Sequence, residues 1–232
     1  MISIIIPTYN ERENICRLIP SILAMANNVK METEIVIVDD NSPDQTADAI
    51  RGQFGQDKRV KVYVRKEERG LASAILHGIR KSKGEIIVGM DADFNHPPER
   101  IPYLIQALSR ADLVIASRFI KGGGMEEWGR YVGTLLFNRF LKYILGFPTM
   151  DNMSGFYAIR KNTLAELGMD AIYKGYGDYH LRLVWYAKSK GYVISEIPVF
   201  YKKRTYGDSK SQLLSLIFSY TLCAIILRLK KH

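Results

Sequence analysis

The chain has 232 residues, 47% of them hydrophobic, which is enough for one sizeable core in a single domain with or without a short appendage. A net charge of +9 favours an anionic partner, either nucleic acid, an anionic membrane surface or a phosphorylated small molecule. The two cysteines, Cys16 and Cys223, lack metal-ligand spacing, which argues against a disulfide scaffold or a zinc site and fits a reducing cytosol. No basic region precedes the segment "ISIIIP" after Met1, so we expect a first strand there rather than a signal peptide.

Apolar runs rich in isoleucine and valine alternate along the chain with segments of helical periodicity. Strands separated by helices of this length predict βαβ units, and hence an α/β fold whose mostly parallel sheet carries helices on both faces. In chain order we predict a strand at 2–7, a helix at 13–26, a strand at 34–40, a helix at 46–54, a strand at 60–64, a helix at 71–82, a strand at 85–91, a helix at 98–109 and a strand at 112–117.

Polar clusters follow three of these strands. They read "PTYNERE" at 7–13, "DDNSPDQT" at 39–46 and "DADFNHPP" at 91–98. Because ligands of open α/β sheets bind at the carboxyl ends of the strands, we expect one site that converges from three loops. The two commonest glycine-rich phosphate-binding motifs do not occur in the sequence, so other groups must hold any phosphates.

The third cluster brings Asp91, Asp93 and Asn95 to one strand end. Carboxylate and amide oxygens suit a hard divalent cation such as Mg²⁺ or Mn²⁺, which can bridge a diphosphate. The alternative is that Asp93 and Asn95 only cap the helix that begins at Pro98. The position of the pair at a strand end, beside two other polar loops, favours the metal site.

Seven blocks of the sequence together resemble a known family. They are "IIPTYNERENI", "IVDDNSPDQTA", "GLASAILHGI", "DADFNHPPE", "SRFIKGG", "DNMSGFYAIRK" and "EIPVFYKKRTYGDSKS", in this order, and the match runs from Ile2 to about Ser211. The chain is similar to the family 2 glycosyltransferases, specifically to the dolichol-phosphate mannose synthase branch. The resemblance implies a GT-A fold, a nucleotide-sugar donor, a divalent metal and a polyprenyl phosphate acceptor at the cytoplasmic face of the membrane.

The resemblance also assigns roles on the nucleoside side. By similarity, Pro7, Tyr9 and Glu11 border the base and the ribose, and Val38 with Asp40 closes the other side of that pocket. For Asp40 and the aspartate before it, the alternative is turn chemistry ahead of the next helix, and we prefer Asp40 as the binding residue.

On the phosphate side, the resemblance implies that Asp91, Ala92 and Asp93 meet the donor ribose, the diphosphate and the metal. Asn95 stands where glutamine is more usual, and this exchange of one amide for another keeps a metal ligand. The resemblance also implies that three basic residues neutralise the phosphates, namely Arg118, Arg204 and Lys210. For Arg204 and Lys210 the alternative is that they are ordinary surface charges. We expect residues 205–211 to act as a lid that closes over the donor.

Sugar transfer to a phosphate monoester needs no general base, because the acceptor is already largely ionised near neutrality. The resemblance places an acidic residue in the helix that precedes the "EIPV" block. Here that region reads "GYGDYHLRLVWYAK", with Arg182 at the corresponding position and Asp178 nearby, so the sugar contacts stay open.

Two apolar segments suggest how a lipid acceptor is met. Residues 128–147 are apolar around most of the helix but contain basic residues, as in a helix that lies in a membrane interface, with a plain core helix as the alternative. Arg130 is the candidate for the lipid phosphate. Residues 213–227 are apolar on all sides, and their rise of about 22 Å is short of the ~30 Å hydrocarbon core. We therefore expect a GT-A domain at 1–211 and a monotopic membrane-associating helix at 212–232.

The sequence as a whole predicts an inverting enzyme that moves a hexose, mannose from GDP-mannose being preferred, onto dolichyl or another polyprenyl phosphate. A polyprenyl-phosphate glucosyltransferase that uses a UDP-sugar is the alternative, because nothing in the sequence identifies the base unambiguously. A basic module that binds nucleic acid is disfavoured, because the basic residues are scattered and no nucleic-acid motif occurs.

Overall fold

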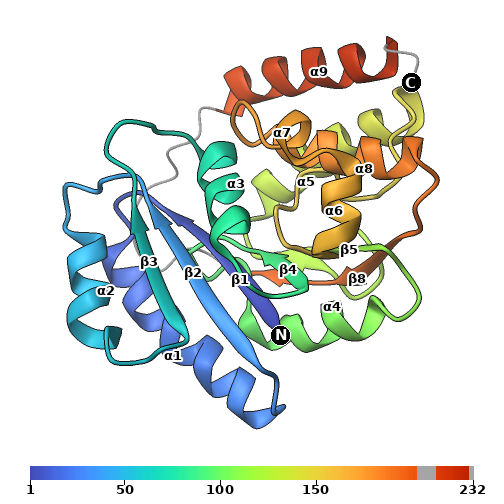
Figure 1. The fold of residues 1–232 in the computed structure, drawn as a ribbon. Coiled ribbons are helices and arrows are strands. Elements are labelled where there is room, and N and C mark those ends of the chain that lie inside the picture. Colours follow the sequence, from blue (N-terminus) through green and yellow to red (C-terminus); the bar gives the residue numbers. More distant parts are fainter. Residues whose placement is uncertain (203–212, 230–232) are drawn as a thin grey trace.

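A computed structural model describes residues 1–202 and 213–229 of the chain (Figure 1). Its centre is a seven-stranded sheet of order β3-β2-β1-β4-β7-β5-β8. The strands are β1 (Ile2–Thr8), β2 (Thr33–Asp39), β3 (Val60–Val64), β4 (Ile86–Gly89), β5 (Leu113–Ser117), β7 (Tyr157–Arg160) and β8 (Ile194–Pro198), and a separate parallel pair is formed by β6 (Gly124–Met125) and β9 (Phe200–Tyr201).

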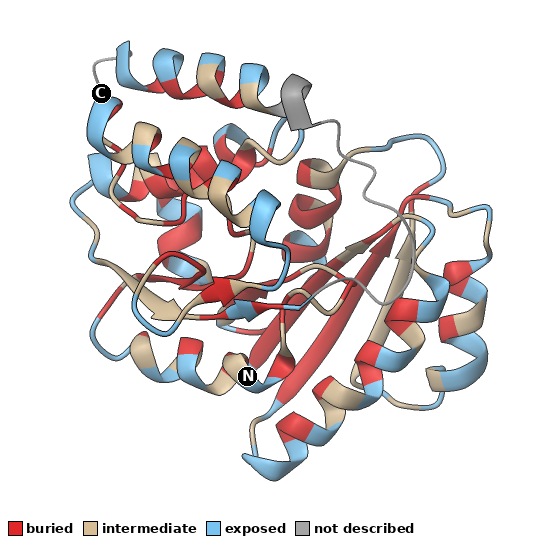
Figure 2. Ribbon diagram, turned by 180° about the vertical axis from the view of Figure 1, so that it is seen from behind, coloured by how far each residue is buried: buried red, intermediate tan, exposed pale blue. Residues whose placement is uncertain are grey.

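Helices cover both faces of the sheet, as the sequence predicts. They are α1 (Arg12–Asn28), α2 (Thr46–Phe54), α3 (Leu71–Lys81), the 3₁₀ turn η1 (Pro98–Arg100), α4 (Ile101–Ala107), α5 (Trp128–Arg139), the π-helical turn η2 (Phe140–Ile144), α6 (Lys161–Leu167), α7 (Met169–Ile172), α8 (Tyr179–Ser189) and α9 (Leu213–Leu229). Figure 2 shows the sheet as the most buried layer, with the exposed sides of these helices turned to solvent.

Alternation along the central strands divides the core into two halves. Ile4 and Ile6 of β1 pack into the half that contains α1 and α4, whereas Ile5 packs into the half that contains α3 and α8. Strands buried on both faces read as continuous apolar runs, which is why the sequence reveals them. The predicted parallel arrangement of β1 to β4 is confirmed by the register of the four strands.

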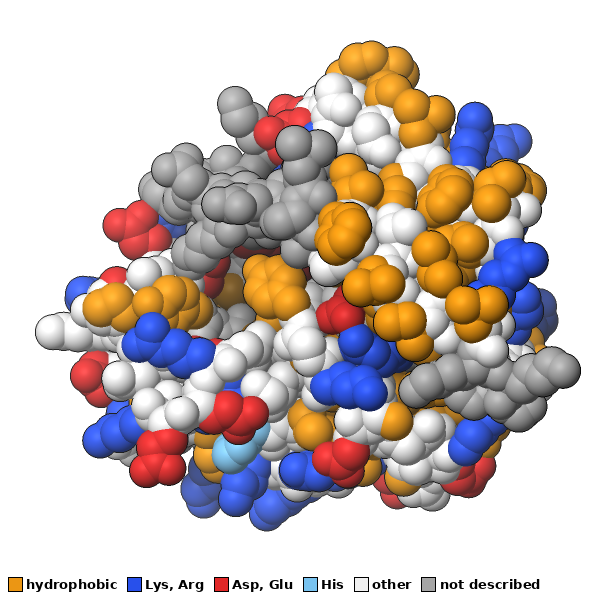
Figure 3. Space-filling view, turned by 90° about the horizontal axis from the view of Figure 1, so that it is seen from above, with side chains coloured by type: hydrophobic (Ala, Val, Ile, Leu, Met, Phe, Trp, Pro, Cys, Tyr) orange, Lys and Arg blue, Asp and Glu red, His pale blue; other side chains and the backbone are white. Residues whose placement is uncertain are grey.

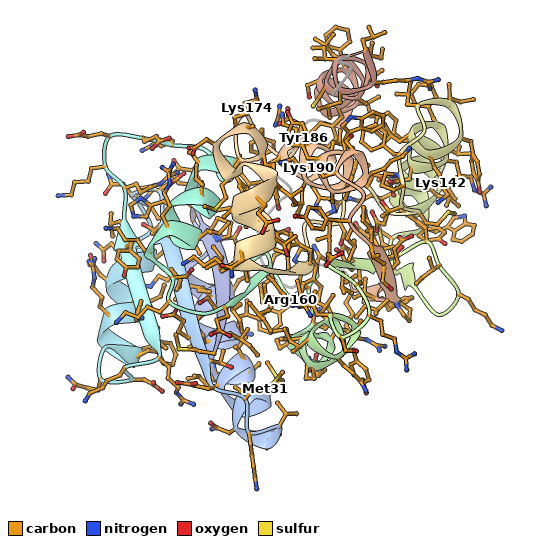
Figure 4. All side chains as sticks on the ribbon, turned by 45° about the vertical axis from the view of Figure 1, so that its right-hand side comes forward. Met31, Lys142, Arg160, Lys174, Tyr186 and Lys190 are labelled. Atoms are coloured by element: carbon orange, nitrogen blue, oxygen red, sulfur yellow. The ribbon has the colours of Figure 1, made fainter. Side chains whose placement is uncertain are left out.

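The sequence analysis did not predict β7, which runs antiparallel between β4 and β5. Its place is fixed by close packing, because a Cβ on Gly89 of β4 would lie 2.4 Å from the ring of Tyr157. At its other end Arg160, labelled in Figure 4, donates hydrogen bonds to the backbone oxygens of Leu108 and Ala111 at 2.5 and 3.2 Å. These contacts join β7 to the loop between α4 and β5.

Helix α5 has an unusual distribution of side chains, with polar residues inside and large apolar residues outside. Asn138 is fully buried and accepts a hydrogen bond from the backbone N–H of Asn152 at 2.7 Å. Trp128 and Leu136, in contrast, are 72% and 60% exposed. The helix therefore combines features of the two alternatives, an interfacial helix and a plain core helix. One side packs on the protein, and the other presents apolar side chains to the exterior.

Helix α9 lies over α7 and α8, on the far side of these helices from the sheet (Figure 1). It packs on α8 through a stripe that includes Tyr220, Ala224 and Leu227, while Phe218 and Leu229 are about three-quarters exposed. Within residues 1–202 and 213–229, no helix is both long and apolar enough for a membrane crossing.

Candidate active site

A cavity of about 1000 Å³ opens at the carboxyl ends of β1, β2 and β4, where the three polar loops converge. Its other walls come from α5, α8 and α9, which contribute Thr134, Tyr179 and Tyr220. The described residues that line it include most of those predicted from the sequence, namely Pro7, Tyr9, Glu11, Asp40, Asp91, Ala92, Asp93, Asn95, Arg118 and Arg130.

The two aspartates after β2 have different roles. Asp39 is buried and holds the turn, because its carboxylate accepts hydrogen bonds from the hydroxyls of Thr8 and Ser42. Asp40 lines the cavity and accepts hydrogen bonds from Arg65 Nε at 2.7 Å and from the N–H of Gly70 at 2.8 Å. Of these two aspartates, Asp40 is the one among the cavity-lining residues, and its contact with the nucleotide stays a prediction.

Tyr9 and Arg69 form a stacked pair on the wall next to Asp40. The Arg69 guanidinium lies 5.2 Å from the centre of the Tyr9 ring, and both side chains line the cavity. Val38 is placed differently, because its side chain is fully buried beneath α3, where a Cβ on Gly78 would approach it to 3.1 Å. The contact of Val38 with the nucleotide stays a prediction. Arg69 was not predicted as a site residue, because no local motif marks it.

The turn after β4 has a fixed shape. Asp93 is 3% exposed and accepts hydrogen bonds from the backbone N–H and the side-chain amide of Asn95 at 3.2 and 2.9 Å. Phe94 adopts a left-handed φ of 61°, which a bulky residue rarely does without support. Asp91 is more open, with 43% of its side chain exposed.

His96 holds this turn in place through a hydrogen bond, a role that was not predicted from the sequence. Its Nδ1 accepts a hydrogen bond from the N–H of Asp91 at 2.8 Å, so the ring proton is on Nε2, which donates to the carbonyl of Ser154 at 3.1 Å. The ring stacks on Phe156 with a centroid distance of 4.9 Å. His96 thereby links the turn after β4 to the segment that enters β7.

Arg118 follows β5 and forms a buried two-pronged ion pair with Asp151, at 2.7 Å from Nε and 2.8 Å from Nη2. Burial disfavours the charged forms, but the pairing outweighs it, so the pKa of Arg118 is raised and the pKa of Asp151 is lowered. The guanidinium also lies 4.9 Å from the centre of the Tyr201 ring. A permanent positive charge therefore faces the cavity.

Helix α8 contributes no carboxylate to the cavity lining in the described part of the chain. Arg182 donates hydrogen bonds to Asp178 and to the backbone oxygen of Lys174, and neither member of the Arg182–Asp178 pair lines the cavity. The residues of α8 that do line it are Tyr179 and His180.

Arg130 lies in the first turn of α5, where it is exposed and 3.5 Å from a carboxylate oxygen of Glu127. Both residues line the cavity. Arg204 and Lys210, together with the predicted lid at 205–211, lie outside the described residues.

A family profile described as glycosyl transferase family 2 matches residues 3–168. The chain belongs to this family. A dolichol-phosphate mannosyltransferase of Pyrococcus furiosus is 35% identical over 214 residues, which cover 90% of this chain and 58% of that relative. An undecaprenyl-phosphate mannosyltransferase of Micrococcus luteus is 35% identical over 212 residues, covering 89% of this chain and 85% of the relative. This family 2 chain thus spans less than two thirds of the Pyrococcus protein.

The fold of this family 2 chain also occurs in solved structures. Glucosyl-3-phosphoglycerate synthase from Mycobacterium tuberculosis, in a complex with Mn²⁺, UDP and phosphoglyceric acid, superposes with a TM-score of 0.75 and 18% sequence identity. The match covers 100% of this chain and 80% of that one. The sheet and its helices therefore form a GT-A fold, as the resemblance implied.

The residues after β4 are compatible with a divalent cation. No group of three or more His, Cys, Asp or Glu side chains that could hold a metal occurs within residues 1–202 and 213–229. A Mg²⁺ site does not need such a group, because one or two carboxylates together with substrate phosphates and water complete its shell. Asp93 is held rigidly by Asn95, and Asp91 reaches the open side of the same turn. The donor set therefore fits a cation that binds with a diphosphate.

Proposed function

We propose that this family 2 chain transfers mannose from GDP-mannose to dolichyl or another polyprenyl phosphate, with inversion, at the cytoplasmic face of a membrane. The carrying observation is that Asp40, Asp93 and Arg118, from three different strand ends, line one cavity in a chain that is 35% identical to several named mannosyltransferases. Among these relatives is also a polyprenol monophosphomannose synthase of Mycolicibacterium smegmatis, 35% identical over 216 residues that cover 89% of this chain and 79% of the relative.

The charges along the cavity support one orientation of the donor. Asp40 offers a hydrogen-bond acceptor to base or ribose donors, and Tyr9 offers a ring for stacking. Asp93 with Asn95 would hold a divalent cation on the diphosphate, and that cation would supply charge neutralisation of the leaving group. Arg118 adds a positive charge farther along the cavity, at the end that the nucleoside does not occupy.

The chemistry asked of the protein is mainly alignment. An oxygen of the acceptor phosphate forms a bond with the anomeric carbon, and the bond from that carbon to the nucleoside diphosphate breaks with its electron pair, so one displacement inverts the centre. The acceptor is already ionised, and no side chain has to remove a proton. Arg118 and Arg130 would hold the acceptor phosphate and the donor diphosphate within reach of each other.

A membrane surface is the expected partner, because the cavity opens beside an exposed apolar face. This face, called here the apolar face, is formed by Trp128, Leu136, Tyr143 and Ile144 of α5 and η2 and by Phe218, Leu222, Ile225, Ile226 and Leu229 of α9. Figure 3, which looks down on α9, shows hydrophobic side chains gathered there with Lys and Arg side chains at the margin. Helices of this kind lie in the headgroup region with apolar side chains inserted and basic ones near lipid phosphates.

The cavity and the apolar face share helices. Arg130 and Phe137 of α5 and Tyr220 of α9 line the cavity, while other residues of the same two helices form the apolar face. Arg228 of α9 also donates a hydrogen bond to the carbonyl of Ile144 at the end of η2. A polyprenyl phosphate in the bilayer could therefore present its headgroup to the cavity while its chain stays in the lipid.

The test is transfer of labelled sugar into a lipid extract, with GDP-mannose, UDP-glucose and UDP-N-acetylglucosamine as separate donors and polyprenyl phosphate vesicles as acceptor. We expect label in the lipid phase only with GDP-mannose and only with Mg²⁺ or Mn²⁺ present. If label were transferred only from UDP-glucose, the proposed donor would be wrong, but the proposed sugar transfer to a polyprenyl phosphate would stand. No transfer from any donor, with the chain shown to be folded, would reject the proposal.

The membrane part is tested separately by sedimentation with anionic vesicles. Replacing Phe218 and Leu222 by serine should weaken binding by about tenfold or more, because each large apolar side chain contributes ~1.5–3 kcal/mol when fully buried. Tyr103→Ser is the matched control, since Tyr103 is an exposed aromatic residue on α4 and not on the apolar face. Equal losses in both proteins would contradict a specific role of the apolar face.

A further inference from the structure

His180 is a buried histidine whose two ring nitrogens have no hydrogen-bond partner among the described residues. It is 1% exposed, yet it lines the cavity together with Tyr179. Buried polar atoms in folded proteins are nearly always paired, and an exception beside a cavity indicates a partner that enters the cavity, either water or a group of the ligand. Trp185 of the same helix also has an unpaired buried N–H, but it does not line the cavity.

The surroundings of His180 restrict what this partner can be. The ring packs against the rings of Tyr157 and Tyr179, with centroid distances of 5.8 and 6.1 Å. Gly155, on the same wall, has no side chain and a left-handed φ of 74°, and a Cβ there would come within 3.4 Å of the Tyr179 hydroxyl. The described surroundings of His180 on this wall are thus two tyrosine rings and a glycine without a side chain, and they offer the ring nitrogens no charged partner.

The charge state of His180 gives the chemistry of the contact. Burial lowers its pKa to about 4, so the ring is neutral near pH 7 in spite of the nearby Asp151. A neutral imidazole has one N–H donor and one acceptor nitrogen. A hydroxyl group can satisfy either of them, whereas an ionised phosphate has only acceptors to offer.

We propose that His180 binds a hydroxyl group of the transferred sugar and is thereby a specificity-determining residue for the donor. The inference rests on the proposed function, because it takes the nucleoside to lie at the Asp40 end and the sugar at the Arg118 end of the cavity. It also gives α8 a sugar contact, which the sequence left open because Arg182 stands where the resemblance places an acidic residue; Arg182 and Asp178 both lie outside the cavity lining.

The experiment compares the binding of GDP-mannose and of GDP by calorimetry, with Mg²⁺ present, in the full chain and in three variants. His180→Leu should bind GDP as the wild type does and GDP-mannose about tenfold more weakly, the usual cost of one lost hydrogen bond. His180→Gln keeps a donor and an acceptor and should recover part of this loss. Trp185→Phe, the matched control, should change neither affinity.

The stability of the unbound variants gives an independent readout. A purely structural histidine replaced by leucine should raise the thermal midpoint, because two unpaired polar atoms are removed, and should leave both affinities unchanged. That result, or an equal loss for GDP and GDP-mannose, would overturn the inference alone. If His180→Leu fails to fold, His180→Phe is measured in its place. A wild-type chain that binds neither GDP nor GDP-mannose would overturn the proposed function together with the inference.

Discussion

Two buried arginine–aspartate pairs present opposite charges to the cavity. Asp40 follows β2 and Arg118 follows β5, with β1, β4 and β7 between them in the sheet, and these two places are called here the two ends of the cavity. At one end Asp40 lines the cavity, and Arg65 holds it from behind. At the other end Arg118 lines the cavity, and Asp151 holds it from behind. One end therefore presents a carboxylate and the other a guanidinium, although both use the same pair of residue types.

The difference gives the cavity a direction. A nucleoside offers N–H and O–H donors to a carboxylate, whereas phosphate oxygens accept hydrogen bonds from a guanidinium. In each pair the residue behind fixes the side chain that faces the ligand, so little ordering is needed when the ligand binds. On the proposed function, the base of the nucleotide sugar lies toward Asp40, and its sugar and the acceptor phosphate lie toward Arg118.

Removal of Asp151, the partner of Arg118, should have the largest effect, and this effect is on the stability of the fold. Asp151→Ala leaves a buried guanidinium without its counter-charge, and we expect a loss of about 3–5 kcal/mol in the free energy of unfolding. Urea denaturation measures it. Asp48→Ala, which removes an exposed carboxylate on α2, is the control and should change stability by less than about 0.5 kcal/mol. Similar losses in the two variants would mean that the Arg118–Asp151 pair contributes no more than a surface pair.

Between the two ends, Asp93 should be essential for turnover. Asp93→Ala is expected to lower kcat by about a thousandfold or more, because the charge of the leaving group is then uncompensated. The thermal midpoint should stay near that of the wild type. Initial rates with and without excess EDTA provide the comparison, and substantial activity in EDTA or in the variant would exclude this assignment.

Acid should affect the Arg118 end through His180. Its pKa is about 4 in the folded chain and about 6.5 when unfolded, so it contributes stability above pH 6.5 that is lost as the pH falls toward 4. This difference of about 2.5 pKa units corresponds to about 3.4 kcal/mol. The charged and titratable groups that act on it are Asp151, Arg118 and His96.

Urea midpoints at pH 7.5 and pH 4.5, for the wild type and for His180→Gln, isolate this contribution from that of the carboxylates. The decrease on acidification should be smaller in the variant. Equal decreases in both proteins would show that His180 does not titrate as its burial predicts.

The smallest effect is expected at the nucleoside end. Asp40→Asn keeps an acceptor for the N–H of Gly70 but removes the charge, and charge-assisted hydrogen bonds are about twice as strong as neutral ones. The affinities for GDP and for GDP-mannose should fall together, by about three- to tenfold. This equality contrasts with the selective loss expected for His180→Leu, and a loss limited to GDP-mannose would reverse the orientation proposed for the donor.

How much the sequence could predict differs between the two halves of the molecule. Strands β1 to β5 and the loops that carry Asp40, Asp91 and Asp93 follow from local patterns, because buried parallel strands and polar turns are written in contiguous residues. The predicted strand at 85–91 is longer than β4, whose pairing with β1 and β7 ends at Gly89.

What the sequence could not predict depends on contacts between distant segments. Arg118 was identified, but its partner Asp151 lies 33 residues away and has no local signature. His96 binds the carbonyl of Ser154, which is 58 residues away in the sequence. The antiparallel strand β7 is not part of the regular alternation of strands and helices that reveals the parallel strands. The polar inner side of α5 could not be predicted either, because Asn138 is buried there through a hydrogen bond with the backbone of Asn152.

The reversed direction of β7 has a consequence for the rest of the chain. A strand that runs against its neighbours begins where they end, so the entry segment with Ser154 and Gly155 reaches the cavity edge. The opposite edge of the sheet carries the connections that start the parallel strands, such as the turns near residues 30, 57 and 191, and the connection from β7 to α6. Surface turns remote from a site tolerate insertions best. An affinity tag or a fluorescent reporter inserted after Gly191 would therefore leave donor binding unchanged.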